Sequence, residues 1–88
     1  MKIKEGFLLR EMVGQWVVVP IGNTVIDFNR IITLTPSAAL LWKELEEGVD
    51  NTSKLVDVIL GEYEVNEETA KQDCEEFIGK LKDQDMLE

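Results

Sequence analysis

The hydrophobic pattern of the chain changes at Thr35-Pro36. Residues 6–35 are rich in β-branched and large apolar side chains and contain Gly14 and Gly22-Asn23 as turn signals. From residue 36 onward, apolar residues recur every three to four positions with charged residues between them. Proline after a threonine that can cap a helix marks a helix start. The chain is therefore expected to form a sheet first and helices afterwards.

Three strands and three helices follow from these patterns. The expected strands are residues 7–13, 16–21 and 30–35, and residues 24–29 remain open as strand or loop. Connections this short do not allow a parallel crossover, so the sheet should be an antiparallel meander. The expected helices lie near residues 36–47, 52–63 and 66–84, and Met86-Leu87 should fold back onto the core. Residues 1–88 are thus predicted to form one α+β domain, winged-helix-like, with a three-stranded antiparallel sheet followed by three helices.

Each expected helix carries one apolar stripe that should face the core. The stripes are Ala38, Leu41, Trp42 and Leu45; Leu55, Val56, Ile59, Leu60 and Tyr63; and Ala70, Cys74, Phe77, Ile78 and Leu81. Trp42 is expected in the core for this reason. Trp16 stays open as a residue that stacks on a planar ligand, because its strand is apolar on both faces.

The helical half of the chain is acidic. Residues 1–42 hold four basic and three acidic side chains, a net charge of +1, and residues 43–88 hold five and fifteen, a net charge of −10, which together give −9. Nucleic-acid binding relies on Lys and Arg that displace counterions, so no nucleic acid is expected as a partner. The acidic faces either keep a small domain in solution or attract a basic peptide or protein surface.

Residue types that support catalysis or metal binding are nearly missing. The chain has no histidine, no CxxC pair, no calcium loop and no glycine-rich phosphate loop. Cys74 lies on an apolar stripe, and its acidic neighbours should raise its pKa, so it is not expected to be a nucleophile. We therefore predict a binding domain that is not an enzyme and needs no metal or cofactor. The lone cysteine, the absence of a signal peptide and the absence of a membrane span favour the cytoplasm.

One edge of the sheet remains as a candidate site. If the strands follow sequence order, the third strand has a free edge, and it carries no charge between Arg30 and Thr35. With the third helix alongside, this edge forms a groove for an extended peptide added as a further strand. The residues expected to line it are Ile31, Ile32, Thr33, Leu34, Ala70, Cys74 and Phe77. Two alternatives stay open: the helix covers the edge completely, or the edge pairs with a second copy to form a homodimer.

The order of core and turn residues along the chain is also informative. One part runs through Val17-Val18-Val19-Pro20-x-Gly22, Asp27-Phe28-Asn29, Ile32-Thr33-Leu34 and Ala38-x-x-Leu41-Trp42-x-x-Leu45-x-x-Gly48. The other comprises Leu55-Val56, Ile59-Leu60, Tyr63, Asp73, Phe77, Leu81 and Leu87. This pattern resembles the PqqD family. Two positions depart from it: Asp85 stands where relatives commonly have glycine, and Cys74 where they commonly have valine.

The resemblance implies the same fold and a function. It implies a peptide chaperone, or recognition element, for ribosomally synthesised, post-translationally modified peptides. Such a domain holds the leader of a precursor peptide beside the third strand, against the third helix, and presents it to a modifying enzyme, often a radical S-adenosylmethionine enzyme. Family members proper serve pyrroloquinoline quinone biosynthesis, and relatives serve other peptide pathways. The residues alone also allow a structural or self-associating winged-helix-like subunit and, less well, a nucleic-acid-binding winged helix.

Overall fold

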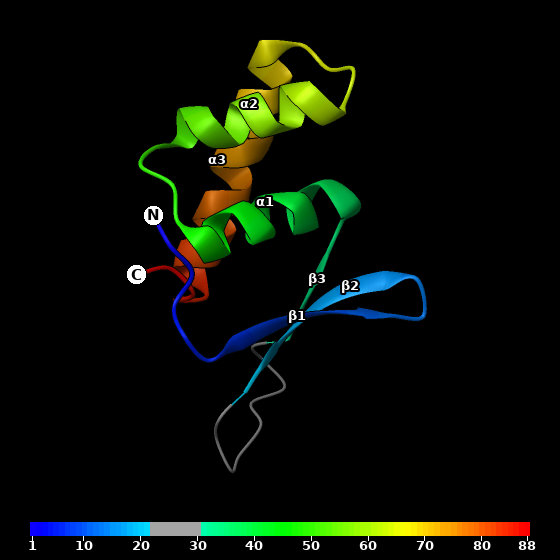
Figure 1. Cartoon of the computed structure of the whole chain (residues 1–88), viewed down its shortest axis with the longest axis vertical. Helices are drawn as coiled ribbons and strands as arrows, with labels where there is room; N and C mark the ends of the chain where they lie inside the picture. Colours follow the sequence, from blue (N-terminus) through cyan, green and yellow to red (C-terminus); the bar gives the residue numbers. More distant parts are fainter. Residues whose placement is uncertain (22–30) are drawn as a thin grey trace.

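The computed structural model describes residues 1–21 and 31–88 and shows a small sheet beside three helices (Figure 1). The elements in chain order are β1 (Phe7–Met12), β2 (Gln15–Pro20), β3 (Ile32–Leu34), α1 (Pro36–Glu47), α2 (Thr52–Glu62) and α3 (Glu67–Asp83). The predicted fold class is confirmed, and each predicted helix agrees with the structure to within a residue at either end. The predictions for the Gly22-Asn23 turn, residues 24–29 and Arg30 lie outside the described residues.

The sheet is an antiparallel meander in the order β1-β2-β3. β1 and β2 are joined by Val13 and Gly14, whose φ angles are 52° and 77°. Two consecutive positive φ values define the tight hairpin turn whose twist matches that of paired strands. Val13 therefore lies in the turn and not in the strand predicted for it.

One face of the sheet contributes to the core. Leu9, Val18 and Ile32 lie opposite one another across the three strands, and Trp16 pairs with Leu34 in the next row. Val18, Ile32 and Leu34 are buried. Because side chains alternate along a strand, Thr33 points to the other face, where it is exposed. The short strand β3 thus gives two of its three side chains to the core.

The helix ends follow the capping residues of the sequence. Thr35 Oγ1 accepts a hydrogen bond from the Ala38 amide at 3.2 Å, and Asn66 Oδ1 accepts one from the Thr69 amide at 2.7 Å. Each bond satisfies one amide that the first turn of a helix leaves without a partner. Gly48 ends α1 with a φ of 97°, a conformation that glycine adopts without strain. α1 and α3 therefore begin where the sequence predicts.

The turn after α3 explains the departure at Asp85. Asp85 has a φ of 56°, its amide donates to the Lys82 carbonyl at 3.0 Å, and the Met86 amide donates to the Leu81 carbonyl at 2.9 Å. This pair of bonds is the Schellman motif, whose left-handed position favours glycine and tolerates aspartate. The Asp85 carboxylate also pairs with Lys4 Nζ at 2.6 Å. The turn is therefore kept without glycine.

The two ends of the described chain lie side by side (Figure 1). Ile3 and Leu87 form an antiparallel bridge, flanked by hydrogen bonds from the Lys4 amide to the Met86 carbonyl and from the Glu88 amide to the Lys2 carbonyl, both 2.8 Å. Met86 is fully buried by this arrangement. The predicted return of the chain onto the core is confirmed.

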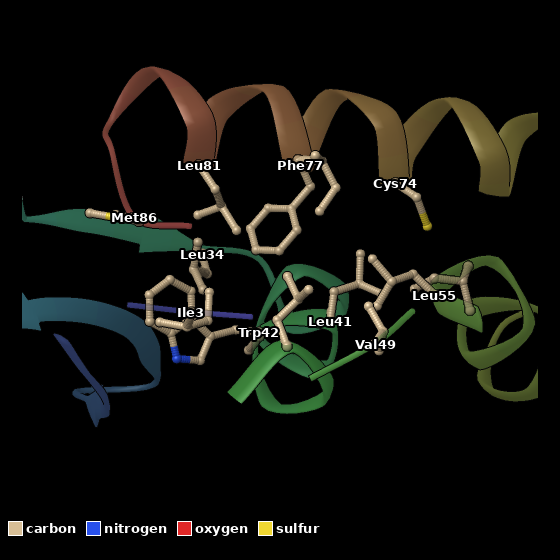
Figure 2. Packing of buried hydrophobic residues seen from close by; sticks show 14 of the residues in the cluster. Ile3, Leu34, Leu41, Trp42, Val49, Leu55, Cys74, Phe77, Leu81 and Met86 are labelled. Carbon is tan, nitrogen blue, oxygen red and sulfur yellow. The ribbon is translucent and has the colours of Figure 1, made fainter. Parts of the chain in front are cut away.

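The core lies between the sheet and the helices (Figure 2). Its largest fully buried side chains are Trp42, Leu45, Leu55, Leu81, Met86, Val18 and Cys74. Trp42 is in the core as predicted, and its Nε1 has no hydrogen-bond partner among the described residues. Trp16 is half-buried, and Lys43 Nζ lies 4.5 Å from the centre of its ring, so a cation already covers the ring that was considered for stacking.

Candidate functional site

The outer edge of β3 is the first part of the candidate site. β3 pairs with β2 on one side, and no strand within residues 1–21 and 31–88 pairs with its other side. α3 packs against α2, while the backbones of α3 and β3 have at most a few close approaches. In the described part of the chain, the third helix therefore leaves the edge of β3 open to a further strand.

A groove of about 450 Å³ begins where β3 ends. We call it the α1–α3 groove. Its lining residues are Thr35, Ser37, Ala38 and Leu41 from the start of α1; Ile59, Tyr63 and Val65 from the end of α2 and the connection after it; and Asp73, Glu76, Phe77 and Lys80 from α3. Thr35 directly follows β3, so the strand edge and the groove are continuous along the backbone.

The floor of the groove is apolar and fixed by the core. Leu41, Ile59 and Phe77 are buried and belong to the core cluster, and Phe77 points from α3 toward Leu41 (Figure 2). Tyr63 and Val65 form a more open wall, with 39% and 38% of their surfaces exposed. The volume is within the range of pockets that bind ligands, and the few polar groups lie at the rim.

The residues predicted for the site fall into three groups. Phe77 lines the groove, Thr33 is exposed on β3, and Ile31 is half-buried just before it. Ile32 and Leu34 face the core, so they reach a bound peptide through their backbone only.

Ala70 and Cys74 form the third group, because both side chains have no exposed surface. Figure 2 shows Cys74 pointing from α3 toward Leu55 of α2. Both residues belong to the core cluster and do not line the groove.

Of the eleven groove-lining residues, Phe77 alone was predicted for the site. The ten that were missing are Thr35, Ser37, Ala38, Leu41, Ile59, Tyr63, Val65, Asp73, Glu76 and Lys80. Tyr63 was predicted in the core as the last residue of the α2 stripe, and this was wrong, as it was for Leu60, which is 36% exposed. The one available signal was Val65, an apolar residue that stands alone between Glu64 and Asn66 in a polar connection.

Cys74, which follows the groove-lining Asp73, has a thiol with a shifted pKa. Burial, and then the carboxylates of Asp73 and Glu75, raise the pKa of the Cys74 thiol, which keeps it protonated and unreactive. Within the described ranges, no three His, Cys, Asp or Glu side chains come together to hold a metal ion. None of the described helices is long and apolar enough to cross a membrane.

Comparison with known families decides the relationship. The sequence model of the family described as Coenzyme PQQ synthesis protein D (PqqD) matches residues 15–87, a span that contains β2, β3 and all three helices. The chain belongs to the PqqD family. The predicted resemblance is thereby confirmed. A search of curated proteins found no match.

Two solved structures are similar to this PqqD-family chain. One is described as TbiB1 in complex with the TbiA(beta) leader peptide; it is 25% identical, with a TM-score of 0.76, and the alignment covers 100% of this chain and 95% of the other. The second is described as lasso peptide synthetase B1 complexed with the leader peptide; it is 19% identical, with a TM-score of 0.74, and the alignment covers 97% and 93% of the two chains. The second likeness concerns the fold alone.

Proposed function

We propose that residues 1–88 act as one peptide-recognition domain that binds the leader of a ribosomally made precursor peptide. The leader adds a strand to the outer edge of β3, and its side chains enter the α1–α3 groove. The observation that carries this proposal is the continuity at Thr35 between the open edge of β3 and the apolar groove. Backbone hydrogen bonds along β3 supply affinity, and the groove selects side chains.

Family membership and the structural neighbours support this function. The PqqD match covers the elements that build the edge and the groove, and it agrees with a binding domain that is not an enzyme. The TbiB1 structure, which aligns over the whole of this chain, contains a leader peptide. A strand beside β3 would lie about 4.8 Å from it, with alternate side chains on each face.

The proposal extends to the partner and the compartment. The bound leader is presented to a modifying enzyme, for which the radical S-adenosylmethionine type is the candidate that the PqqD resemblance supports. The lone, buried Cys74 is consistent with a reducing cytoplasm. A homodimer through the edge of β3 is the competing use of the same surface.

The test begins with peptides selected from a displayed library of random sequences on the immobilised domain. A labelled selected peptide is then titrated against the domain by fluorescence anisotropy, and shifts are mapped by NMR. We expect shifts across residues 31–35 and at Tyr63 and Phe77. Blocking the peptide amides one at a time by N-methylation should weaken binding at alternate positions, because every second amide of an added strand points to β3.

A matched pair of variants tests the groove. Tyr63→Ala removes a partly exposed wall residue, and binding should weaken by about 1–2 kcal/mol, or about five- to thirtyfold. Leu60→Ala removes an equally exposed side chain of α2 that does not line the groove, so binding should be unchanged. Equal affinity of both variants and no shifts at 31–35 would contradict the site. Sedimentation that depends on concentration and is unaffected by the peptide would instead support the homodimer.

A further inference from the structure

The charged side chains that line the groove are two carboxylates and one ammonium group. Asp73, Glu76 and Lys80 border the apolar floor and recur at the spacing of one face of α3. Glu76 accepts a hydrogen bond from Gln72 at 3.3 Å, and none of the three charged groups is in an ion pair within the described structure, where Lys4 pairs with Asp85. These charges are therefore available to a ligand in the groove.

The charges are separated along the groove. Leu81 lies over Leu34 of β3 (Figure 2), and Lys80 is the residue before it, so position 80 belongs to the part of α3 nearest β3. Cys74 points toward Leu55 of α2 (Figure 2), and Asp73 is the residue before it, so position 73 belongs to the part of α3 nearest α2. A peptide that runs along β3 and continues into the groove meets the positive charge first and the carboxylates beyond it.

The α2 end gains further negative charge from the connection between α2 and α3. Tyr63, which forms the wall there, is flanked by Glu62 and Glu64, and both are exposed. Among the described residues that line the groove, Lys80 is the one basic side chain. The apolar wall at this end is thus surrounded by carboxylates.

We infer that the peptide bound here carries a Lys or Arg directly beyond the apolar side chain that fills the groove, and that Asp73 and Glu76 pair with it. The inference rests on the proposed function, since it specifies the sequence of the bound leader. An acidic side chain at the same position would be repelled, so the carboxylates act on specificity as well as affinity. An arginine fits especially well because it can bond both oxygens of a carboxylate.

Binding itself makes this pairing necessary. A peptide that covers the apolar floor displaces water from the carboxylates of Asp73 and Glu76. A carboxylate that loses water without gaining a new partner raises the free energy of the complex. A basic side chain restores the lost interactions, whereas a neutral one does not. The groove therefore discriminates among peptides that share the same apolar residue.

Two double variants of α3 isolate the effect. Asp73→Asn with Glu76→Gln removes the two rim charges, while Glu68→Gln with Glu75→Gln removes two carboxylates that do not line the groove. Both variants change the net charge by the same amount, so a general effect of charge acts on both. A random displayed peptide library is selected on the wild-type domain, and the enriched peptides are titrated against all three proteins by anisotropy.

We expect enriched peptides with Lys or Arg next to an apolar residue. Their binding should weaken about three- to tenfold in the Asp73/Glu76 variant and less than twofold in the control. Replacing the basic residue of the peptide by Gln should weaken binding to the wild type by the same factor and leave binding to the Asp73/Glu76 variant nearly unchanged. The difference should shrink at about 1 M salt, where charges are screened within about 3 Å.

The outcomes separate this inference from the proposed function. Peptides that shift residues 31–35 but show no preference for basic residues, or bind both double variants equally, overturn the inference and leave peptide capture intact. Peptides enriched in acidic residues also overturn it. If no peptide is enriched, the proposed function itself is contradicted.

Discussion

Replacing Cys74 by arginine tests which side of α3 faces the groove. Cys74 has no exposed surface and points toward α2 in Figure 2. The carboxylates of Asp73 and Glu75 belong to exposed neighbours, so an arginine can pair with them only by leaving the core. The structure therefore predicts that Cys74→Arg unfolds the protein and does not merely weaken peptide binding.

The expected loss of stability follows from two terms. Burying a charge without a partner costs several kcal/mol even after the surroundings relax. Forcing a large side chain into a packed site adds about 1–3 kcal/mol. The sum, about 5 kcal/mol or more, is comparable with a total stability of about 4–13 kcal/mol for 88 residues. Most molecules of the variant should be unfolded, or close to it, at room temperature.

Circular dichroism and urea titration measure this loss. Gln72→Arg adds the same charge at an exposed position of the same helix, and its free energy of unfolding should stay within about 0.5 kcal/mol of the wild type. Cys74→Val keeps an apolar side chain and should change the free energy by less than about 1.5 kcal/mol. The three variants together separate charge, burial and size.

A folded Cys74→Arg protein would refute the reasoning. If its unfolding midpoint in urea matched that of Gln72→Arg, the side chain at position 74 would be reaching solvent. If peptide binding were also lost in that folded protein, Cys74 would line the binding surface, as the sequence first suggested. Cys74 would then not be packed between α3 and α2.

Three further predictions concern stability. Asn66→Ala should lower the free energy of unfolding by about 1 kcal/mol, measured in urea, because α3 loses its cap, while Asn66→Asp should keep it. The free energy of unfolding of Trp42→Phe should stay within about 1 kcal/mol of the wild type, because removing the unpartnered Nε1 offsets the lost apolar area. Trp42→Ala should lose about 3–5 kcal/mol. A large loss for Trp42→Phe would mean that Nε1 has a partner. Because the pKa of Cys74 is raised from 9.0 in the folded state, the thiol of the unfolded chain loses its proton first as the pH rises. Relative to Cys74→Val, the free energy of unfolding should be constant below about pH 8 and fall above it. Urea titrations at a series of pH values measure this difference.

The order of the elements was predictable because local signals are strong at their boundaries. Thr35 and Asn66 cap helices through their own side chains, and such caps are visible in sequence. The left-handed position at Asp85 was also visible, as a departure from glycine, but its consequence was not. The hydrogen bonds and the ion pair with Lys4 that preserve the turn join residues far apart in the chain.

The lining of the groove was harder to predict. Tyr63 continues the apolar stripe of α2 in sequence, yet the helix ends at Glu62 and Tyr63 has an extended backbone, with φ −131° and ψ 146°. Its side chain therefore leaves the helical face that the periodicity describes. Ala70 and Cys74 are buried rather than exposed in the groove for a different reason. A stripe shows which face of α3 is buried but not which neighbour covers it. Apart from Phe77, the residues of α3 that line the groove are Asp73, Glu76 and Lys80, which lie beside the stripe and not on it.

The pairing of the two chain ends gives the domain a low resistance to mechanical force. The bonds around the Ile3–Leu87 bridge join antiparallel segments, so tension applied between residues 1 and 88 enters at one end and breaks them one after another. Ile3 and Met86 are then the first core side chains to be withdrawn, and the end of α3 follows them. Such peeling damages the helix that carries Phe77 and Lys80 while the pairing of β1 with β2 is still intact. Tension that enters the domain at residues 1 and 88 would therefore disrupt the α1–α3 groove early in unfolding.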